Sequence, residues 1–243
     1  MTHDGITYFV GNEGTYSGGG IYVSWFSELL LTEGGTVSFC NNHAGENGGA
    51  IYIHDRSEGN FMGNVSFEVN HANDSGGAIC LYLESIIHVD GMTSFVGNEA
   101  INNGGVVYIV DDCNASFGGA VYIDEASNAS FGGETVFANN TAEIGGALYS
   151  SDSALYVEAG TRFMFNVAST GSGGGVYASK TVMSLNNTVF TGNRGVWGGG
   201  VASFSSGSIW DEENNDFGPS NITGCRFDCN KATDGGAIYT AAG

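Results

Sequence analysis

The chain repeats one short motif, Phe-x-x-Asn, eight times along its 243 residues. Successive copies mostly begin 26 to 30 residues apart, with two longer intervals of 42 and 37 residues. The motifs begin at Phe9, Phe39, Phe67, Phe95, Phe137, Phe163, Phe190 and Phe227. A period of about 28 residues is typical of a solenoid, in which each repeat packs only on its two neighbours.

The apolar residues within each repeat alternate with polar ones, as in Ile51-Tyr52-Ile53 and Val65-Ser66-Phe67. A period of two is the signature of β-strands. The 41 Gly residues also disfavour helices, because each Gly inside a helix costs about 1 kcal/mol relative to Ala. We therefore predict one all-β domain over residues 1–243, a parallel β-helix of about eight to nine coils of roughly 28 residues, each with three short strands.

Two columns of side chains follow from this repeat. The Phe of each motif should point inward and stack on the Phe of the next coil. The Asn should lie at a turn, where it tolerates left-handed backbone geometry and its amide can form a ladder of hydrogen bonds. The predicted ladder contains Asn12, Asn42, Asn70, Asn98, Asn140, Asn166, Asn193 and Asn230. Paired Gly residues between the motifs should supply backbone angles that other residues avoid.

A second motif, Gly-Gly-Ala followed by an aliphatic residue, alternates with the first. It reads GGAIY at 48–52, GGAIC at 76–80, GGALY at 145–149 and GGAIY at 235–239. This pair of motifs resembles the repeats of chlamydial polymorphic membrane proteins. The resemblance implies a right-handed β-helix, similar to an autotransporter passenger, that is displayed at a cell surface as an adhesin.

Two segments interrupt the repeat. Residues 106–119 and 120–133 are tandem copies of fourteen residues, so we expect residues 106–119 to be an inserted half-repeat that bulges or pairs as an extra strand. Residues 207–220 hold the only Pro and an acidic cluster. We expect them to form a loop that projects from the rod, with Trp210 at its base.

The residue after the recurring aliphatic position should point outward. It is Tyr in seven of nine copies, namely Tyr22, Tyr52, Tyr108, Tyr122, Tyr149, Tyr177 and Tyr239. Stacked rings of this kind would stabilise the sheet. They would equally form a face that binds a sugar or a neighbouring rod, and Trp210 is a further candidate for such a face.

The formal net charge of −20 argues against a nucleic-acid-binding role and against binding to anionic membranes, since both require Lys and Arg. No apolar stretch approaches the ~20 residues of a spanning helix, so we expect no membrane insertion. Sequons for N-glycosylation begin at Asn64, Asn73, Asn114, Asn128, Asn139, Asn186 and Asn221. They permit a glycosylated extracellular protein.

Signals of catalysis are weak. The acidic pairs Asp111-Asp112 and Asp124-Glu125 have no basic residue nearby in the sequence. We therefore expect no catalytic residues, no metal site and no cofactor. A carbohydrate-binding or carbohydrate-active β-helix, similar to a polysaccharide lyase, is the alternative.

The terminal segments suggest how the rod continues. Residues 4–13 match residues 90–99 at eight of ten positions, so the sequence starts inside a coil, and it stops just after a strand. Uncapped strand edges are templates for pairing. We expect axial stacking, as a filament subunit or as a segment of a longer adhesin. The expected partners are a further copy of the chain, a host or cell-surface protein, or a glycan, and the expected location is extracellular or at the cell surface.

Overall fold

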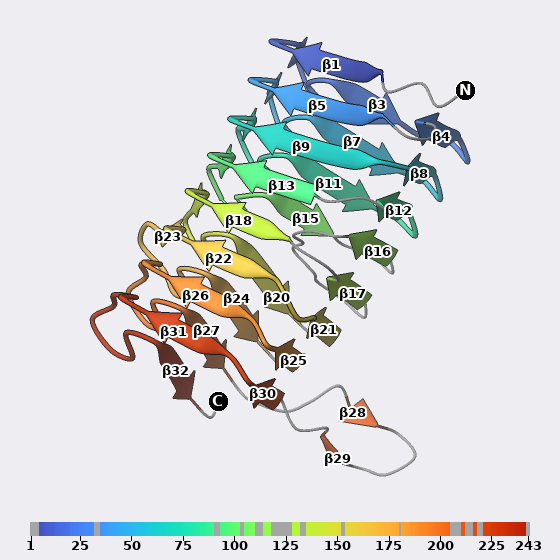
Figure 1. Ribbon diagram of the computed structural model, residues 1–243. Coiled ribbons are helices and arrows are strands. Elements are labelled where there is room, and N and C mark those ends of the chain that lie inside the picture. The colour runs from blue at the N-terminus through green and yellow to red at the C-terminus, as the bar shows by residue number, and fades with distance from the viewer. Residues whose placement is uncertain are drawn as a thin grey trace.

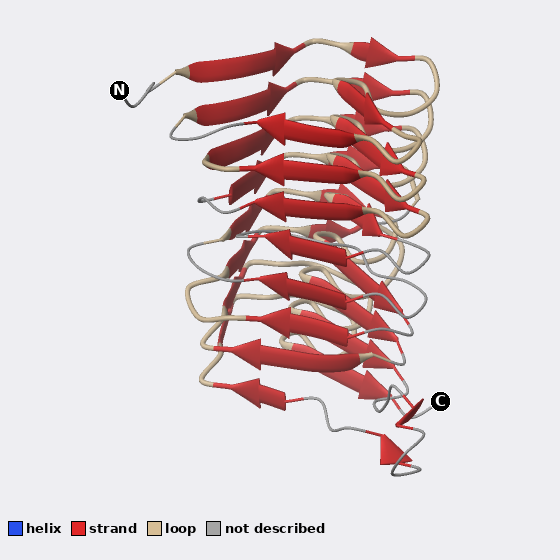
Figure 2. Ribbon diagram, turned by 90° about the vertical axis from the view of Figure 1, so that its right-hand side faces the viewer, coloured by secondary structure: helices blue, strands red, loops and turns tan. Residues whose placement is uncertain are grey.

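The computed structural model describes residues 5–31, 35–89, 93–102, 105–109, 114–117, 128–131, 135–151, 154–179, 181–204, 210–211, 216–217 and 221–241. Over these residues the chain is an all-β parallel solenoid, which confirms the predicted fold (Figures 1 and 2). Viewed from the N-terminal end, the chain winds clockwise as it recedes, so the coil is right-handed (Figure 1).

Each complete coil contributes one strand to each of four sheet positions around the rod, one more than the three strands expected. The first sheet contains β1 (Ile6–Val10), β5 (Thr36–Cys40), β9 (Asn64–Glu68), β13 (Thr93–Val96), β18 (Val136–Ala138), β22 (Arg162–Met164), β26 (Val189–Thr191) and β31 (Arg226–Asp228). The second, of two-residue strands, contains β2 (Glu13–Gly14), β6 (His43–Ala44), β10 (His71–Ala72), β14 (Glu99–Ala100), β19 (Thr141–Ala142) and β23 (Val167–Ala168).

The third position is divided between two groups of four strands. One contains β3 (Ile21–Val23), β7 (Ile51–His54), β11 (Ile79–Tyr82) and β15 (Val107–Ile109), and the other β20 (Leu148–Ser151), β24 (Val176–Ser179), β27 (Val201–Phe204) and β32 (Ile238–Ala241). The fourth sheet contains β4 (Glu28–Leu31), β8 (Glu58–Phe61), β12 (Ile86–Val89), β16 (Asn114–Phe117), β17 (Asn128–Phe131), β21 (Ala154–Val157), β25 (Val182–Asn186) and β30 (Asn221–Thr223).

The solenoid has about six turns of roughly 28 residues, slightly fewer than the eight to nine expected. Only the coils that begin with β1 to β22 contribute to the sheet of two-residue strands. In the last two coils Arg194 and Lys231 make isolated parallel bridges in place of strands. The sequence motif thus continues past the point where the full set of four strands ends.

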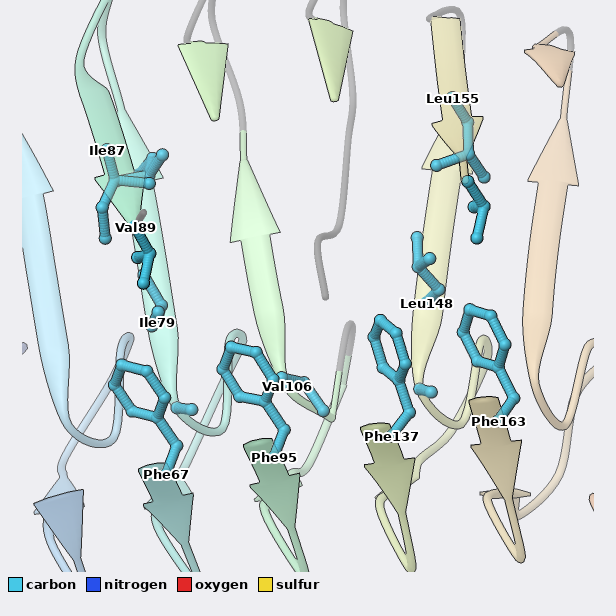
Figure 3. Close-up of a cluster of buried hydrophobic side chains, with 14 of the residues drawn as sticks. Phe67, Ile79, Ile87, Val89, Phe95, Val106, Phe137, Leu148, Leu155 and Phe163 are labelled. Carbon is cyan, nitrogen blue, oxygen red and sulfur yellow. The ribbon is translucent and has the colours of Figure 1, made fainter. Parts of the chain in front are cut away.

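The Phe column forms the core of the rod, as predicted (Figure 3). Each described Phe from Phe39 to Phe190 in this column is fully buried and faces the aliphatic residues of the opposite sheets. Ring centroids of successive coils are 4.2–4.9 Å apart, except for Phe95 and Phe137, which are 6.3 Å apart. Between the coils of Phe95 and Phe137 the fourth sheet contains two strands, β16 and β17, where the first sheet passes directly from β13 to β18. The two coils are therefore further apart at the fourth sheet.

The pairing of β16 with β17 brings the two tandem copies side by side. Their four Cα partners are identical residue types, from Asn114 opposite Asn128 to Phe117 opposite Phe131. Many residues around these strands lie outside the described ones, so the boundaries 106–119 of the inserted half-repeat stay a prediction. In the segment 207–220, β28 (Trp210–Asp211) and β29 (Asp216–Phe217) pair antiparallel and lie beyond the last coils of the rod (Figure 1). The remainder of that loop lies outside the described residues.

The Asn residues of the motif form a hydrogen-bonded ladder along the rod. The Asn70 amide nitrogen donates to Asn98 Oδ1 and to the Phe39 carbonyl oxygen, both at 3.0 Å. Its Oδ1 accepts from the backbone N–H and the side-chain amide of Asn42, at 3.0 and 2.9 Å. The side chain of a middle Asn therefore uses both of its donors and both of its acceptor positions inside the rod.

The left-handed residue at this turn is the one before the ladder Asn, not the Asn itself, which corrects the sequence interpretation. The eight left-handed residues are Gly11, Asn41, Val69, Gly97, Asn139, Phe165, Gly192 and Cys229, with φ between 53° and 67°. The side chain of the ladder Asn must point inward, so that its amide reaches the core. The residue before it makes the turn and leaves its own side chain outside.

The paired Gly residues have two different roles. The first Gly of each pair, such as Gly48 at φ 66°, is left-handed. The second, such as Gly49, lies against the neighbouring coil, and a Cβ there would collide with the Gly77 carbonyl oxygen. The predicted backbone role therefore applies to the first Gly, and the second Gly permits the close approach of two coils.

Val69 provides a test of the left-handed turn. A β-branched residue at φ 55° is unfavourable, and its side chain is 57% exposed. We expect Val69→Asn to raise the free energy of unfolding by about 1 kcal/mol, because Asn accepts this geometry. Chemical denaturation measures the change. The adjacent Glu68→Asn, at an ordinary φ, should give no increase, and an equal increase in both variants would contradict the assignment of the turn.

Candidate functional site

The outward positions of the third sheet carry an aromatic surface along one side of the rod. In each of these strands the first residue points into the core, as Ile51 and Val176 do, so the next residue faces outward. Parallel register places Tyr22 beside Tyr52 and Tyr149 beside Tyr177. The surface has two parts, because β15 and β20 belong to different groups of strands.

The first part, which we call the N-terminal aromatic cluster, consists of Tyr22, Tyr52 and His54. The two Tyr rings stack with centroids 5.4 Å apart, and the His54 ring lies 5.1 Å from each. His54 Nδ1 lies 2.9 Å from the Asp55 carboxylate, and Nε2 lies 2.5 Å from the Tyr22 hydroxyl. With Nδ1 donating to the carboxylate, Nε2 is left to accept from Tyr22.

The second part, the C-terminal aromatic cluster, consists of Tyr149, Tyr177, Trp197, Phe204 and Tyr239. Tyr149 and Tyr177 stack at 4.8 Å, and Trp197 stacks on Tyr239 at 5.9 Å. Phe204 lies between the two pairs, 5.3 Å from Tyr177 and 5.5 Å from Tyr239. Because Trp197 is 42% exposed, this cluster presents a wide aromatic surface to solvent.

Burial affects the phenols of both clusters. Burial, together with smaller contributions from Cys80 and Tyr22, raises the pKa of Tyr52 well above its ordinary value. Burial also raises the pKa of Tyr177. A raised folded-state pKa stabilises the fold below the unfolded pKa of ~10, and this contribution is lost as pH rises through the folded value. The stacked rings of both clusters are contacts of the kind that stabilise a sheet.

The predicted binding residues are only partly brought together. Tyr22 and Tyr52 meet in one cluster, and Tyr149, Tyr177 and Tyr239 in the other. Only the backbones of Tyr108 and Trp210 are described, in β15 and β28, and Tyr122 lies outside the described residues.

Sequence reasoning missed His54, Trp197 and Phe204. The signal for Phe204 is available in the sequence: Ala202 interrupts the Tyr column, and the residue two positions later faces the same side. Ala202 is fully buried, and the Phe204 ring occupies the space that a Tyr would fill.

The sequons differ in their surroundings. Asn139 is exposed and left-handed at a turn, and Asn64 and Asn221 are exposed at the starts of β9 and β30. Asn73 is exposed, and its Oδ1 lies 3.3 and 3.0 Å from the Nε2 atoms of His43 and His71. Asn186 is half-buried in β25. For Asn114 and Asn128 only the backbone is described.

Across the described part of the chain, no group of three or more His, Cys, Asp or Glu side chains is placed to hold a metal ion. Among the same residues there is no helix that could cross a membrane. The acidic pairs at 111–112 and 124–125 lie outside the described residues.

Three segments of the chain match the family model of the Chlamydia polymorphic membrane protein repeat. They are residues 36–54, 64–82 and 134–151. Each segment contains one Phe-x-x-Asn motif, one Gly pair and the outward position after the recurring aliphatic residue, which is Tyr52, Cys80 and Tyr149 in turn. No curated protein and no solved structure shows significant similarity to the chain.

Proposed function

We propose that this chain, which carries repeats of the Chlamydia polymorphic membrane protein type, is an extracellular or cell-surface β-solenoid with a structural and adhesive role. In this proposal it stacks axially, either as a filament subunit or as a segment of a longer surface adhesin. The observation that carries the proposal is the unbroken register of the first sheet, where Phe lies on Phe from β1 to β31, with the Asn ladder beside it.

The two ends of the stack differ from its middle. Phe9, Phe227 and Ile238 are only partly buried, whereas the corresponding residues of inner coils are fully buried. Leaving such apolar area in water costs about 25 cal/mol per Å². The strands β1 and β32 each have a neighbour on one side only. A further coil, from the same polypeptide or from a second copy, would cover these rings and extend the ladders.

Two charged substitutions test the axial contact. Sedimentation velocity of the unmodified chain should show association that grows with concentration. Ile6→Lys combined with Tyr239→Lys places a charge on each end strand, so we expect this double variant to sediment as a monomer while circular dichroism shows the same strand content.

The matched control is Ile101→Lys combined with Tyr156→Lys. These side chains are 54% and 42% exposed on the side of the rod, and the change in charge is identical. This control should still associate. A monomeric unmodified chain at every concentration, or a control that dissociates equally, would contradict axial stacking.

The aromatic surface supports a second candidate, the binding of a glycan. The exposed Trp197 stacked on Tyr239 offers a flat apolar face of the kind that ligand sites use beside a few polar groups. Loss of binding to a glycan array in Trp197→Ala, with retention in Tyr16→Ala, would support this candidate.

We propose no hydrolase or lyase activity, and polysaccharide cleavage that disappears in Asp111→Asn combined with Asp112→Asn would refute that proposal.

A further inference from the structure

The corner between the third and fourth sheets is built differently from the corner with the Asn ladder. Three successive coils turn there through two adjacent left-handed residues: Trp25-Phe26, Asp55-Arg56 and Leu83-Glu84. Their φ values lie between 53° and 61°. We call these six residues the corner ridge.

Five of the six residues in the corner ridge are of types that a left-handed backbone disfavours, and Asp55 is the exception. At the Asn-ladder corner, five of the eight left-handed residues are Gly or Asn, whereas none of the six in the ridge is either. Trp25, Phe26 and Leu83 are nevertheless 74%, 70% and 40% exposed. Bulky apolar side chains that are both unfavourable in conformation and exposed to water indicate a role in binding.

The ridge surrounds a pocket of about 280 Å³, lined by all six of its residues. Inside it, the Arg56 guanidinium lies 5.8 Å from the centre of the Phe26 ring. The same guanidinium donates two hydrogen bonds to the Glu84 carboxylate, at 2.8 and 2.6 Å, and these bonds lower the pKa of Glu84. The ridge thus already holds one cation between an aromatic face and a carboxylate.

The charge around the ridge is negative. Glu28 and Glu58 are partners in register on the adjoining strands β4 and β8, and Asn60 donates to both. Together with Asp55 and Glu84 they give four carboxylates beside the single Arg56. The whole chain carries a formal charge of −20, which steers cationic partners toward it.

We propose that the corner ridge binds a Lys- or Arg-rich segment of a partner protein. A cationic side chain of the partner lies on the exposed Trp25 ring, and the carboxylates of the ridge and of β4 and β8 pair with its neighbours. The ridge adjoins the N-terminal aromatic cluster, because the Asp55 carboxylate lies 2.9 Å from His54 Nδ1. Its first two residues, Trp25 and Phe26, lie in the first coil between the edge strands β3 and β4. Binding of a cationic segment at the ridge does not require axial stacking.

The test uses an octa-arginine peptide and isothermal titration calorimetry at about 0.1 M salt. Trp25→Asn combined with Phe26→Asn should weaken binding at least tenfold with no change in net charge. Because Asn accepts the left-handed geometry, the melting temperature of this double variant should stay the same or rise. Tyr16→Asn, which removes a ring that is 71% exposed elsewhere, should bind like the unmodified chain.

A second pair of variants separates local charge from total charge. Glu28→Gln combined with Glu58→Gln should weaken peptide binding more than Glu13→Gln combined with Glu158→Gln does, although each pair of substitutions removes two negative charges. Equal affinity for ridge variants and controls would overturn the proposal, because the peptide would then bind the acidic surface in general. A lower melting temperature of the double Asn variant would also overturn it, by making the rings structural. The proposal would also be overturned if binding of the neutral sugar maltohexaose required Trp25 and binding of the peptide did not.

Discussion

Phe67→Ala should lower the free energy of unfolding by about 3–5 kcal/mol, as expected for a buried Phe reduced to Ala. Phe67 is fully buried, and its ring stacks on Phe39 at 4.9 Å and on Phe95 at 4.8 Å. Its removal therefore leaves a cavity that faces two rings at once. Chemical denaturation followed by circular dichroism measures the change.

Phe165 is the matched control, since it is the same residue type on the outside of the rod. It is 55% exposed, and its ring lies over Gly192 of the next coil. We expect Phe165→Ala to cost less than about 1 kcal/mol, as surface substitutions do. Similar costs at the two positions would show that the Phe column is not the core of the rod.

Asn70→Ala should destabilise the protein by about 3 kcal/mol or more, although it removes only a small polar group. The backbone N–H and the side-chain amide of Asn42 would lose their acceptor, and the Phe39 carbonyl oxygen would lose a donor. These groups are buried, and each buried group without a partner costs about 1–3 kcal/mol. Thermal and chemical denaturation would both show the loss.

The end of the same ladder supplies the comparison. Among the described residues, the Asn12 side chain donates to Asn42 Oδ1 at 2.8 Å and lies in an exposed turn. Asn12→Ala should therefore cost about 1 kcal/mol or less. If the two substitutions cost the same, the ladder would contribute as separate surface hydrogen bonds and not as a buried network.

The repeat made the main features of the fold predictable. The parallel sheets and the buried Phe column could be predicted from three features. These are the period near 28 residues, the alternation of apolar and polar residues, and the recurrence of Phe and Asn at fixed positions. These features depend on residue type and spacing alone, because every coil meets the same neighbours on either side.

The turns were less predictable, because their backbone geometry overrides the preferences of individual residues. Val69 and Phe165 are left-handed where Gly or Asn would be favoured, so their positions could not be inferred from propensity. The same is true of Trp25 and Phe26 in the corner ridge. The register of the ladder, which brings each Asn amide into the core, imposes the turn on whichever residue precedes it.

The aromatic surface was predictable as a column but not as two clusters. The Tyr positions follow from alternation, whereas the insertion of Phe204 depends on the small size of Ala202 in the neighbouring position. Trp197 reaches Tyr239 from a Gly-rich turn whose path cannot be read from spacing. Contacts between a turn and a strand of the next coil need the three-dimensional arrangement.

Electron cryomicroscopy of the unmodified chain at high concentration is a direct test of axial stacking. We expect rods joined end to end, with a layer spacing of about 4.8 Å along their axis and continuous density for the Phe and Asn columns across the junction. Particles that remain single at every concentration, or that associate side by side through the aromatic clusters, would contradict it.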